Sequence, residues 1–443
     1  MTMFLCAVAA LVPAADPEPK LAAQSAIAWP EFRGPTHEGH TAGPAPLEWS
    51  DSEGIVWQTP LDGLGWSSPT VDRGLVVLTT AVAEGESQSL RLQVVDFATG
   101  ELKTDRELFR QDDSPAVEMH QKNSHASPTP VLARDAAGRT VCYAHFGPHG
   151  TAAVAIDDAG RLETLWSTAV PAYLSQHGTG GSPALHGTPD DGTLVVCCDG
   201  RDVQSVVGLD AATGELQWQT PREAEASRGF SFGTPLLIPR DGTGSGRQAI
   251  CPGSSAVMSL DPDTGEELWR VRYGEGYSVV PRPVYDPDLG EAGLVFVCSG
   301  FGDKTVYAID PTGSGDVTDS HVAWSQKKQT PMSPSLLLHD GLLYSVSDRG
   351  IAFCREAATG EVVWTDRLGG NFSASPLLVA DDEGDRIYWQ DESGVCTVTA
   401  AGREAKTLAT NRFVRGKRTF ASYALVDGDF LIRTESALLR VGR

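Results

Sequence analysis

The sequence predicts an all-β chain that closes into an eight-bladed β-propeller with four-stranded antiparallel blades. Three observations predict this fold: a short motif recurs at the spacing of propeller blades, a Ser-Pro pair opens one strand in most repeats, and eight innermost strands can be counted. The helical periodicity of apolar residues is absent throughout. The chain is therefore expected to form a ring of sheets.

The first repeat is the motif Asp-x-x-Thr-Gly-Glu-x-x-Trp. It recurs, with at most one departure, over residues 96–104, 210–218, 261–269 and 356–364. The Thr-Gly pair is expected to turn the chain between the third and the outermost strand of a blade. The tryptophan on the outermost strand is large enough to pack against the neighbouring blade. Six of the ten tryptophans take this position: Trp57, Trp166, Trp218, Trp269, Trp324 and Trp364.

The second repeat is a Ser-Pro pair, or a close variant, that opens the innermost strand of a blade. Its copies lie roughly 40 to 60 residues apart, which is the length of a propeller blade. They are Ser68-Pro69, Ser127-Pro128, Ser182-Pro183, Thr234-Pro235, Arg282-Pro283, Ser333-Pro334 and Ser375-Pro376. In the sixth repeat, turn residues separate four expected strands: Ser333–Leu338, Gly341–Val346, Ile351–Arg355 and Glu361–Leu368.

The count of innermost strands predicts how the ring closes. Eight such strands begin near Trp66, His125, Gly181, Phe232, Val279, Met332, Ser373 and Ala421. The last repeat supplies only three strands: Ala421–Val426, Asp429–Thr434 and Ala437–Val441. The segment Ile55–Pro60, which contains Trp57, stands before the first blade without a blade of its own. We therefore expect this N-terminal strand to complete the eighth blade and to leave no open edge at the seam.

The charge of the chain restricts its partners. With 58 acidic against 35 basic residues, the chain carries a formal net charge of −23, which repels nucleic acids and anionic membranes at long range. No long basic run offsets this charge. We therefore expect no nucleic acid among the partners.

The start of the chain resembles an export signal. Met3–Val12 is apolar but too short to span a bilayer, and the small residues Pro13–Ala15 follow it. We expect a signal peptide over residues 1–15, an N-terminal extension over 16–53 and a single propeller domain over 54–443. This organisation predicts a periplasmic or secreted protein without a transmembrane segment.

The tandem Thr-Gly-Glu-x-x-Trp repeats, from about Ile55 to Arg443, resemble the PQQ-like propeller family. That family includes quinoprotein alcohol dehydrogenases and the outer-membrane assembly lipoprotein BamB. The opening sequence Trp29–Pro35 resembles that of exported bacterial PQQ-like repeat proteins. The resemblance implies the fold and leaves the function open, because one fold hosts many functions.

The adjacent cysteines Cys197 and Cys198 bear on the cofactor. Quinoprotein dehydrogenases carry an adjacent-cysteine disulfide against the PQQ ring, and Arg201 is a conceivable carboxylate partner. Those enzymes also need a calcium shell with a catalytic Asp, which we cannot assign here. We therefore expect no tight PQQ binding. The alternative interpretation is two strand residues that point to opposite faces of one strand. We expect the cysteines of other strands to be small buried hydrophobes: Cys142, Cys251, Cys298, Cys354 and Cys396.

Loops that enter the innermost strands share one face of a propeller with loops that join the second and third strands. Around blades 2 and 3 these loops carry five of the ten histidines. The candidate ligand-binding residues are His120, His125, His145, His149, His177, Asp199, Arg201 and Asp202, with Arg282 and Asn371 at the mouth of the central channel. The metal candidates are His145, His149 and His177, because imidazoles suit zinc, copper or nickel. The alternative is that these are loop histidines that cap turns and bind backbone carbonyls.

The leading hypothesis for function is an exported, monomeric binding or scaffold protein. Its loop face would contact a protein, a peptide or a cell-envelope polymer. The alternative is a PQQ-dependent or metal-dependent enzyme that uses the His-rich face, and a third is a structural module of a larger assembly. No sequence motif of nucleotide-binding loops, serine hydrolases or zinc proteases occurs, so no catalytic residue is assigned.

Overall fold

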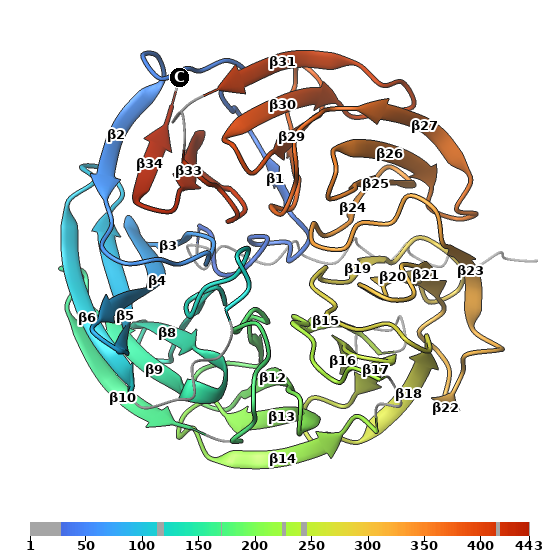
Figure 1. Cartoon of the computed structure of the whole chain (residues 1–443), viewed down its shortest axis with the longest axis horizontal. Helices are drawn as coiled ribbons and strands as arrows, with labels where there is room; N and C mark the ends of the chain where they lie inside the picture. The colour runs from blue at the N-terminus through green and yellow to red at the C-terminus, as the bar shows by residue number, and fades with distance from the viewer. Residues whose placement is uncertain are drawn as a thin grey trace, which may run out of the picture.

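The computed structural model describes residues 28–112, 119–169, 171–223, 227–240, 246–412 and 417–442. Eight mostly antiparallel sheets surround a central axis (Figure 1), so the predicted eight-bladed all-β propeller is confirmed. The expected signal peptide over residues 1–15 lies outside the described residues. No helix in the described part of the chain has the length and apolar character that a membrane span requires.

The first four blades follow one another along the chain. Blade 1 contains β3 (Thr70–Asp72), β4 (Leu75–Glu84), β5 (Ser87–Asp96) and β6 (Leu102–Gln111). Blade 2 contains β7 (Val131–Arg134), β8 (Thr140–His145), β9 (Thr151–Ile156) and β10 (Leu162–Thr168), with a short 3-10 helix at Gly147–His149. Blade 3 contains β11 (Ala184–His186), β12 (Thr193–Asp199), β13 (Gln204–Asp210) and β14 (Leu216–Pro221). Blade 4 contains β15 (Leu236–Pro239), β16 (Arg247–Pro252), β17 (Ala256–Leu260) and β18 (Glu267–Arg272), and β22 (Gly315–Asp316) pairs with its outer edge.

The last four blades include two strands from the N-terminal part of the chain. Blade 5 contains β19 (Val284–Asp286), β20 (Leu294–Cys298), β21 (Val306–Ile309) and β23 (Val322–Gln326). Blade 6 contains β24 (Leu337–His339), β25 (Leu342–Val346), β26 (Ile351–Glu356) and β27 (Val362–Arg367). Blade 7 contains β28 (Leu377–Ala380), β29 (Arg386–Gln390), β30 (Val395–Ala400) and β31 (Thr407–Arg412), preceded in the sheet by β1 (His40–Ala42). Blade 8 contains β32 (Ala424–Val426), β33 (Asp429–Arg433), β34 (Ala437–Val441) and β2 (Ile55–Pro60).

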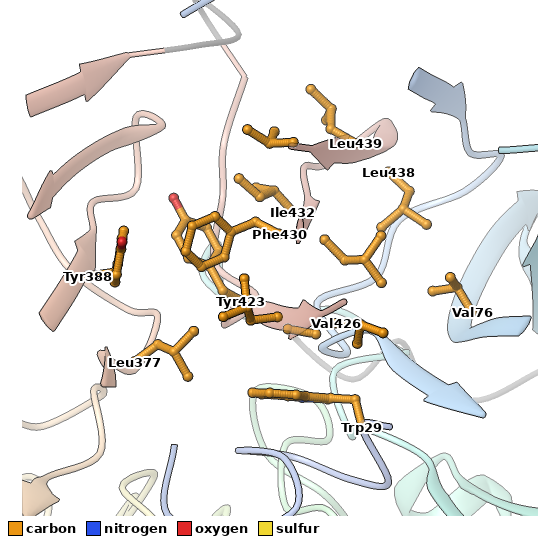
Figure 2. Close-up of a cluster of buried hydrophobic side chains, with 14 of the residues drawn as sticks. Trp29, Val76, Leu377, Tyr388, Tyr423, Val426, Phe430, Ile432, Leu438 and Leu439 are labelled. Carbon is orange, nitrogen blue, oxygen red and sulfur yellow. The ribbon is translucent and has the colours of Figure 1, made fainter. Parts of the chain in front are cut away.

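The ring closes through β2, as the sequence predicts. This strand pairs antiparallel with β34, from Ile55 opposite Val441 to Pro60 opposite Ala437. Figure 2 shows the core at this seam, where Phe430 and Leu438 of the last blade lie between side chains of blades 7 and 1. The seam is therefore packed like the interior of a blade, and β2 covers the edge of β34 there.

The innermost strands are shorter than the sequence predicts. The expected strand Ser333–Leu338 is observed as β24, Leu337–His339, and the expected strand Ala421–Val426 as β32, Ala424–Val426. The residues just before each observed strand line the channel and do not pair with the second strand of their blade. There, for example, the N–H of Ser335 donates to a hydroxyl of the next blade rather than to a neighbouring strand.

The outer-strand tryptophans join neighbouring blades. The indole Nε1 of Trp166 donates to the Ala211 carbonyl of the next blade at 2.9 Å. The ring lies over Gly214, where an added Cβ would come within 2.4 Å of it. Gly214 also has a φ of +76°, which favours glycine. The Thr-Gly-Glu-x-x-Trp motif thus supplies the tryptophan that covers the following blade and the glycine that receives one from the preceding blade.

The chain before β2 crosses one end of the ring. We call residues 29–39 the plug segment, and Figure 1 shows this part of the chain, in dark blue, passing the centre. Trp29 forms a β-bridge with Val71 of blade 1, and the Pro30 carbonyl accepts from the Leu132 N–H of blade 2. The segment then leads into β1, which lies parallel to β28 of blade 7.

Candidate functional site

A ring of hydroxyl groups surrounds the channel. Each blade contributes the residue two positions before its innermost strand, and this residue is Ser or Thr in every blade except blade 5, which has Arg282. The backbone N–H of one member donates to the hydroxyl of the next. The links are Ser68 to Thr129 (2.9 Å), Thr129 to Ser182 (2.9 Å), Ser182 to Thr234 (3.0 Å), Arg282 to Ser335 (3.0 Å), Ser335 to Ser375 (3.0 Å), Ser375 to Ser422 (2.9 Å) and Ser422 to Ser68 (3.2 Å).

This ring explains the Ser-Pro repeat. In four blades the first residue of the pair is itself the ring hydroxyl. In blades 2 and 6 the ring residue is Thr129 or Ser335, two positions beyond the predicted Ser127 and Ser333. The Thr234 N–H finds no ring hydroxyl in blade 5, because Arg282 takes that position.

Arg282 binds the plug segment. Its side chain is 2% exposed, and it donates to the Pro235 carbonyl at 3.0 Å, to the Phe32 carbonyl at 2.8 Å and to the Glu31 carboxylate. Glu31 also accepts from Nδ1 of His37 at 2.8 Å. Burial opposes ionisation of Glu31, but the charges of Arg282 and His37 lower its pKa to about 2. Arg282, expected at the channel mouth, is therefore buried, and it does not line the cavity described next.

The channel contains a cavity of about 320 Å³, which we call the cup. Phe32 of the plug segment lines it, as do six hydroxyls of the ring: Ser68, Thr129, Ser182, Thr234, Ser375 and Ser422. The residues two positions before the ring members form a second tier of the wall: Trp66, Ser127, Gly180, Phe232, Val280, Ser333, Ser373 and Phe420. The cup is thus built from alternate residues of extended segments, which point to the same side.

Aromatic rings cover two sides of the cup. On one side, Phe230 lies 5.2 Å from the His177 ring and 5.6 Å from the Tyr277 ring, and Phe301 continues the row 6.4 Å beyond Tyr277. On another side, Trp66 and Phe420 lie 4.6 Å apart. These distances join ring centroids and fall in the usual range of aromatic pairs.

The structure brings the predicted histidines together in pairs. His120 and His177 lie 5.8 Å apart and both line the cup. His125 and His149 lie 6.3 Å apart and do not line it. His145 is buried, with Nδ1 2.8 Å from the Thr151 hydroxyl.

Burial makes most of these histidines neutral at pH 7. It lowers the pKa values of His145 and His149 to about 4, aided in each case by a neighbouring histidine. It also lowers the pKa of His125, and that of His120 with smaller contributions from His177 and Lys122. Neutral imidazoles can bind metals. Among the described residues, however, the group of three ligand atoms within 4.8 Å of one another is His339, Asp340 and Asp385, and it contains none of the metal candidates.

The predicted residues of the blade 3 loop have different environments. Asp199 is buried and accepts two hydrogen bonds from the Arg222 guanidinium, at 2.9 and 3.1 Å. Asp202 is exposed and accepts from the Leu174 N–H at 2.7 Å, while the N–H of the exposed Arg201 donates to the Leu174 carbonyl at 2.9 Å. Asp199 therefore belongs to a buried ion pair, whereas Arg201 and Asp202 lie on the surface.

The residues of the channel do not fit PQQ with calcium. Cys197 and Cys198 are consecutive residues of β12 and pack into different cores, Cys197 with Cys251 of blade 4 and Cys198 with Tyr143 of blade 2. They are free thiols that point to opposite faces of the strand. In the described part of the chain no Asp or Glu lines the cup, so a carboxylate shell for calcium is missing there.

Sequence reasoning missed the aromatic and cationic residues of the cup. Trp66, Phe232 and Phe420 stand two positions before a ring hydroxyl, so a period of two counted back from each Ser-Pro pair would have found them. Lys122 and Arg228 carry no comparable signal, because they lie on loops whose path depends on contacts with other blades.

Comparisons with known proteins agree with this architecture. The profile of a family described as "Outer membrane protein assembly factor BamB" matches residues 149–366 and, in an overlapping match, 302–408, which together exceed half of the chain. The outer membrane protein assembly factor BamB of Nitrosomonas eutropha is 25% identical over 222 residues, or 49% of this chain and 46% of that protein. The match thus spans about half the length of this relative.

Solved structures resemble this chain at low identity. BamB from Moraxella catarrhalis gives a TM-score of 0.55 at 14% identity and covers 88% of this chain and 97% of its own. Quinohemoprotein alcohol dehydrogenase from Comamonas testosteroni gives 0.61 at 10% identity, with coverages of 94% and 81%. Saccharomyces cerevisiae Sqt1 gives 0.57 at 10% identity, with coverages of 91% and 100%. At such identities these likenesses show the fold alone.

Proposed function

We infer that this chain, which belongs to the BamB-like PQQ-repeat propeller family, is an exported scaffold protein of the bacterial envelope that binds protein partners. The resemblance to BamB, an outer membrane protein assembly factor, supports a role in assembly. The proposed location is the periplasm or the outside of the cell, and the proposed state is a monomer.

The observation that carries this proposal is an exposed leucine whose backbone is hydrogen-bonded on the loop surface of blade 3. Leu174 is 51% exposed and is one of six large hydrophobic residues exposed on the described surface. Its N–H donates to the Asp202 carboxylate and its carbonyl accepts from the Arg201 N–H, and these two bonds hold its backbone in place. A fixed leucine beside an arginine suits an interface, because little conformational entropy is lost when a partner covers it.

The charge of the surface supports a preference among partners. A protein with a net charge of −23 associates faster with basic or neutral proteins than with acidic ones. The alternative, a metal-dependent enzyme that uses the His-rich face with His145, His149 and His177 as metal candidates, stays a prediction. The PQQ-dependent alternative is less favoured because the described residues that line the cup include no carboxylates.

Site-specific photo-crosslinking in the bacterium that produces the protein tests the scaffold function. A photoreactive residue at Leu174 is expected to give discrete adducts with one or a few proteins. The matched control is Leu216 on the outer strand β14 of the same blade, which is 40% exposed and is expected to give none. Equal adduct patterns from both positions, or no adducts from Leu174, would contradict the proposal.

A further inference from the structure

We propose that the cup binds the end of an acidic oligosaccharide, with the terminal uronic-acid ring inside the channel and its carboxylate held by Arg228. This binding activity goes beyond the scaffold function and does not depend on it. Four features of the cup support the proposal: its closed end, its ring of hydroxyl donors, its aromatic walls and the sign of its charges.

The shape of the cup favours the end of a chain over its middle. Phe32 lines the cavity from the plug segment, and the Phe32 carbonyl is bound to Arg282. Further contacts tie the plug segment to blades 1 and 2 through Trp29 and Pro30. A linear polymer therefore cannot thread through the ring without displacing these contacts, whereas a terminal sugar can enter from the open side.

The hydroxyl ring offers unused donors to such a ligand. Each of its six cup-lining oxygens accepts one backbone N–H. Across the described ranges none of these six hydroxyls donates to a protein acceptor. Each hydroxyl group carries a hydrogen that can rotate toward an acceptor. The ring oxygen and the hydroxyl oxygens of a sugar can accept these hydrogen bonds.

The aromatic walls suit the C–H faces of a pyranose ring, because the face of an aromatic ring is electron-rich. Trp66 adds a specific signal. Its side chain is 6% exposed and lines the cup, and its indole N–H is buried without a hydrogen-bond partner among the described residues. Buried donors are nearly always satisfied in folded proteins, and a rotation of this indole toward the cup would let a ligand oxygen accept from its N–H.

The charges select an acidic sugar over a neutral one. Apart from the phenol of Tyr277, the ionisable residues that line the described cup are basic or imidazole groups, namely His120, Lys122, His177 and Arg228, in a chain whose net charge is −23. Lys122 is paired with Glu392 at 2.6 Å. Arg228 donates to the Tyr277 hydroxyl at 2.9 Å and lies 4.9 Å from the centroid of that ring. It has no carboxylate partner within the described ranges and remains free to bind a carboxylate of the ligand.

Calorimetric titration of the purified full chain tests the proposal. The probes are trimers of galacturonic, glucuronic and mannuronic acid, the neutral trimer that corresponds to each, and benzoate. At least one uronate trimer is expected to bind in a 1:1 ratio and to change the tryptophan fluorescence, with its neutral counterpart weaker by about tenfold or more. Binding of none of the uronates, equal binding of the neutral trimers, or binding of benzoate alone would overturn the proposal.

Two matched variants locate the site. Arg228→Gln is expected to weaken uronate binding by about tenfold, and Arg201→Gln, on the neighbouring surface outside the cup, to leave it unchanged. The reverse pattern would move the site out of the cup and refute the assignment. Crosslinking from Leu174 reports on the scaffold function separately, so failure of one proposal leaves the other interpretable.

Discussion

The backbone N–H of Ser422 donates to the hydroxyl of Ser68 at 3.2 Å across a sequence separation of 354 residues. This bond joins the hydroxyl ring at the seam between the last blade and the first. The strand pairing of β2 with β34 joins the same two ends of the propeller at its outer wall. The seam is thus closed at the channel by this hydrogen bond and at the outer wall by the strand pairing.

Removal of residues 1–62 deletes both β2 and the plug segment. The truncated protein is expected to associate and to melt at a lower temperature, because β34 becomes an unpaired edge and the core around Phe430 is exposed. Light scattering after gel filtration and thermal unfolding measure these effects. Removal of residues 1–27 is the control and is expected to change neither property. A monomeric 63–443 fragment with the parent melting temperature would refute ring closure as a source of stability.

Because outer-strand tryptophans pack on the glycines of the Thr-Gly turns, alanine substitutions at two glycines are expected to lower the free energy of unfolding by different amounts. Gly265 and Gly85 have similar φ values of +71° and +68°, but a Cβ at Gly265 would come within 2.5 Å of Trp218, whereas one at Gly85 meets nothing within 4 Å. Gly85→Ala is expected to cost about 1 kcal/mol, the backbone penalty alone. Gly265→Ala is expected to cost about 1–3 kcal/mol more, because the indole must move. Equal losses in urea unfolding would show that the indole does not constrain this turn.

Glu38 in the plug segment predicts a pH-dependent stability. Burial raises its pKa from 4.5 to about 7, although the Tyr285 N–H and nearby cations oppose the shift. The folded state therefore holds the proton more tightly than the unfolded state, and the wild type loses stability as pH rises from 4.5 to about 7. Glu38→Gln, which keeps an acceptor for Tyr285, is expected to be more stable than the wild type by on the order of 2 kcal/mol at pH 8. At pH 4 the difference should nearly vanish, and a constant difference in urea midpoints at both pH values would contradict this mechanism.

Because Asp199 forms a buried ion pair with Arg222, its substitution is expected to destabilise the protein far more than the same substitution at the nearby Asp202. Both side chains are fully buried, so Asp199→Asn leaves an uncompensated guanidinium charge and is expected to cost about 3–5 kcal/mol. Asp202→Asn, on the exposed loop three residues away, is expected to change the free energy of unfolding by less than about 0.5 kcal/mol. Equal effects of the two substitutions on the urea midpoint would show that Asp199 carries no structural charge.

The sequence by itself determined the fold, the number of blades and the way the ring closes. These follow from local patterns, since the Thr-Gly turn and the tryptophan recur in each blade and every copy performs the same packing task. The strand Ile55–Pro60 could be assigned to the last blade because it carries the outer-strand Trp57 that the last repeat lacks. Repetition makes such an inference robust, because one unusual copy does not hide the others.

Only the tertiary structure decided which polar residues meet and which are free. Glu31 and Arg282 are 251 residues apart, and no periodic pattern pairs them. Asp199 and Arg201 are neighbours in sequence, yet Asp199 is buried against Arg222 while Arg201 reaches the surface. The physical reason is that a loop side chain finds its partners across blades, where the path of several segments sets the distance. Strand residues repeat with the pleat of their own sheet, and this local rule can be read from the chain.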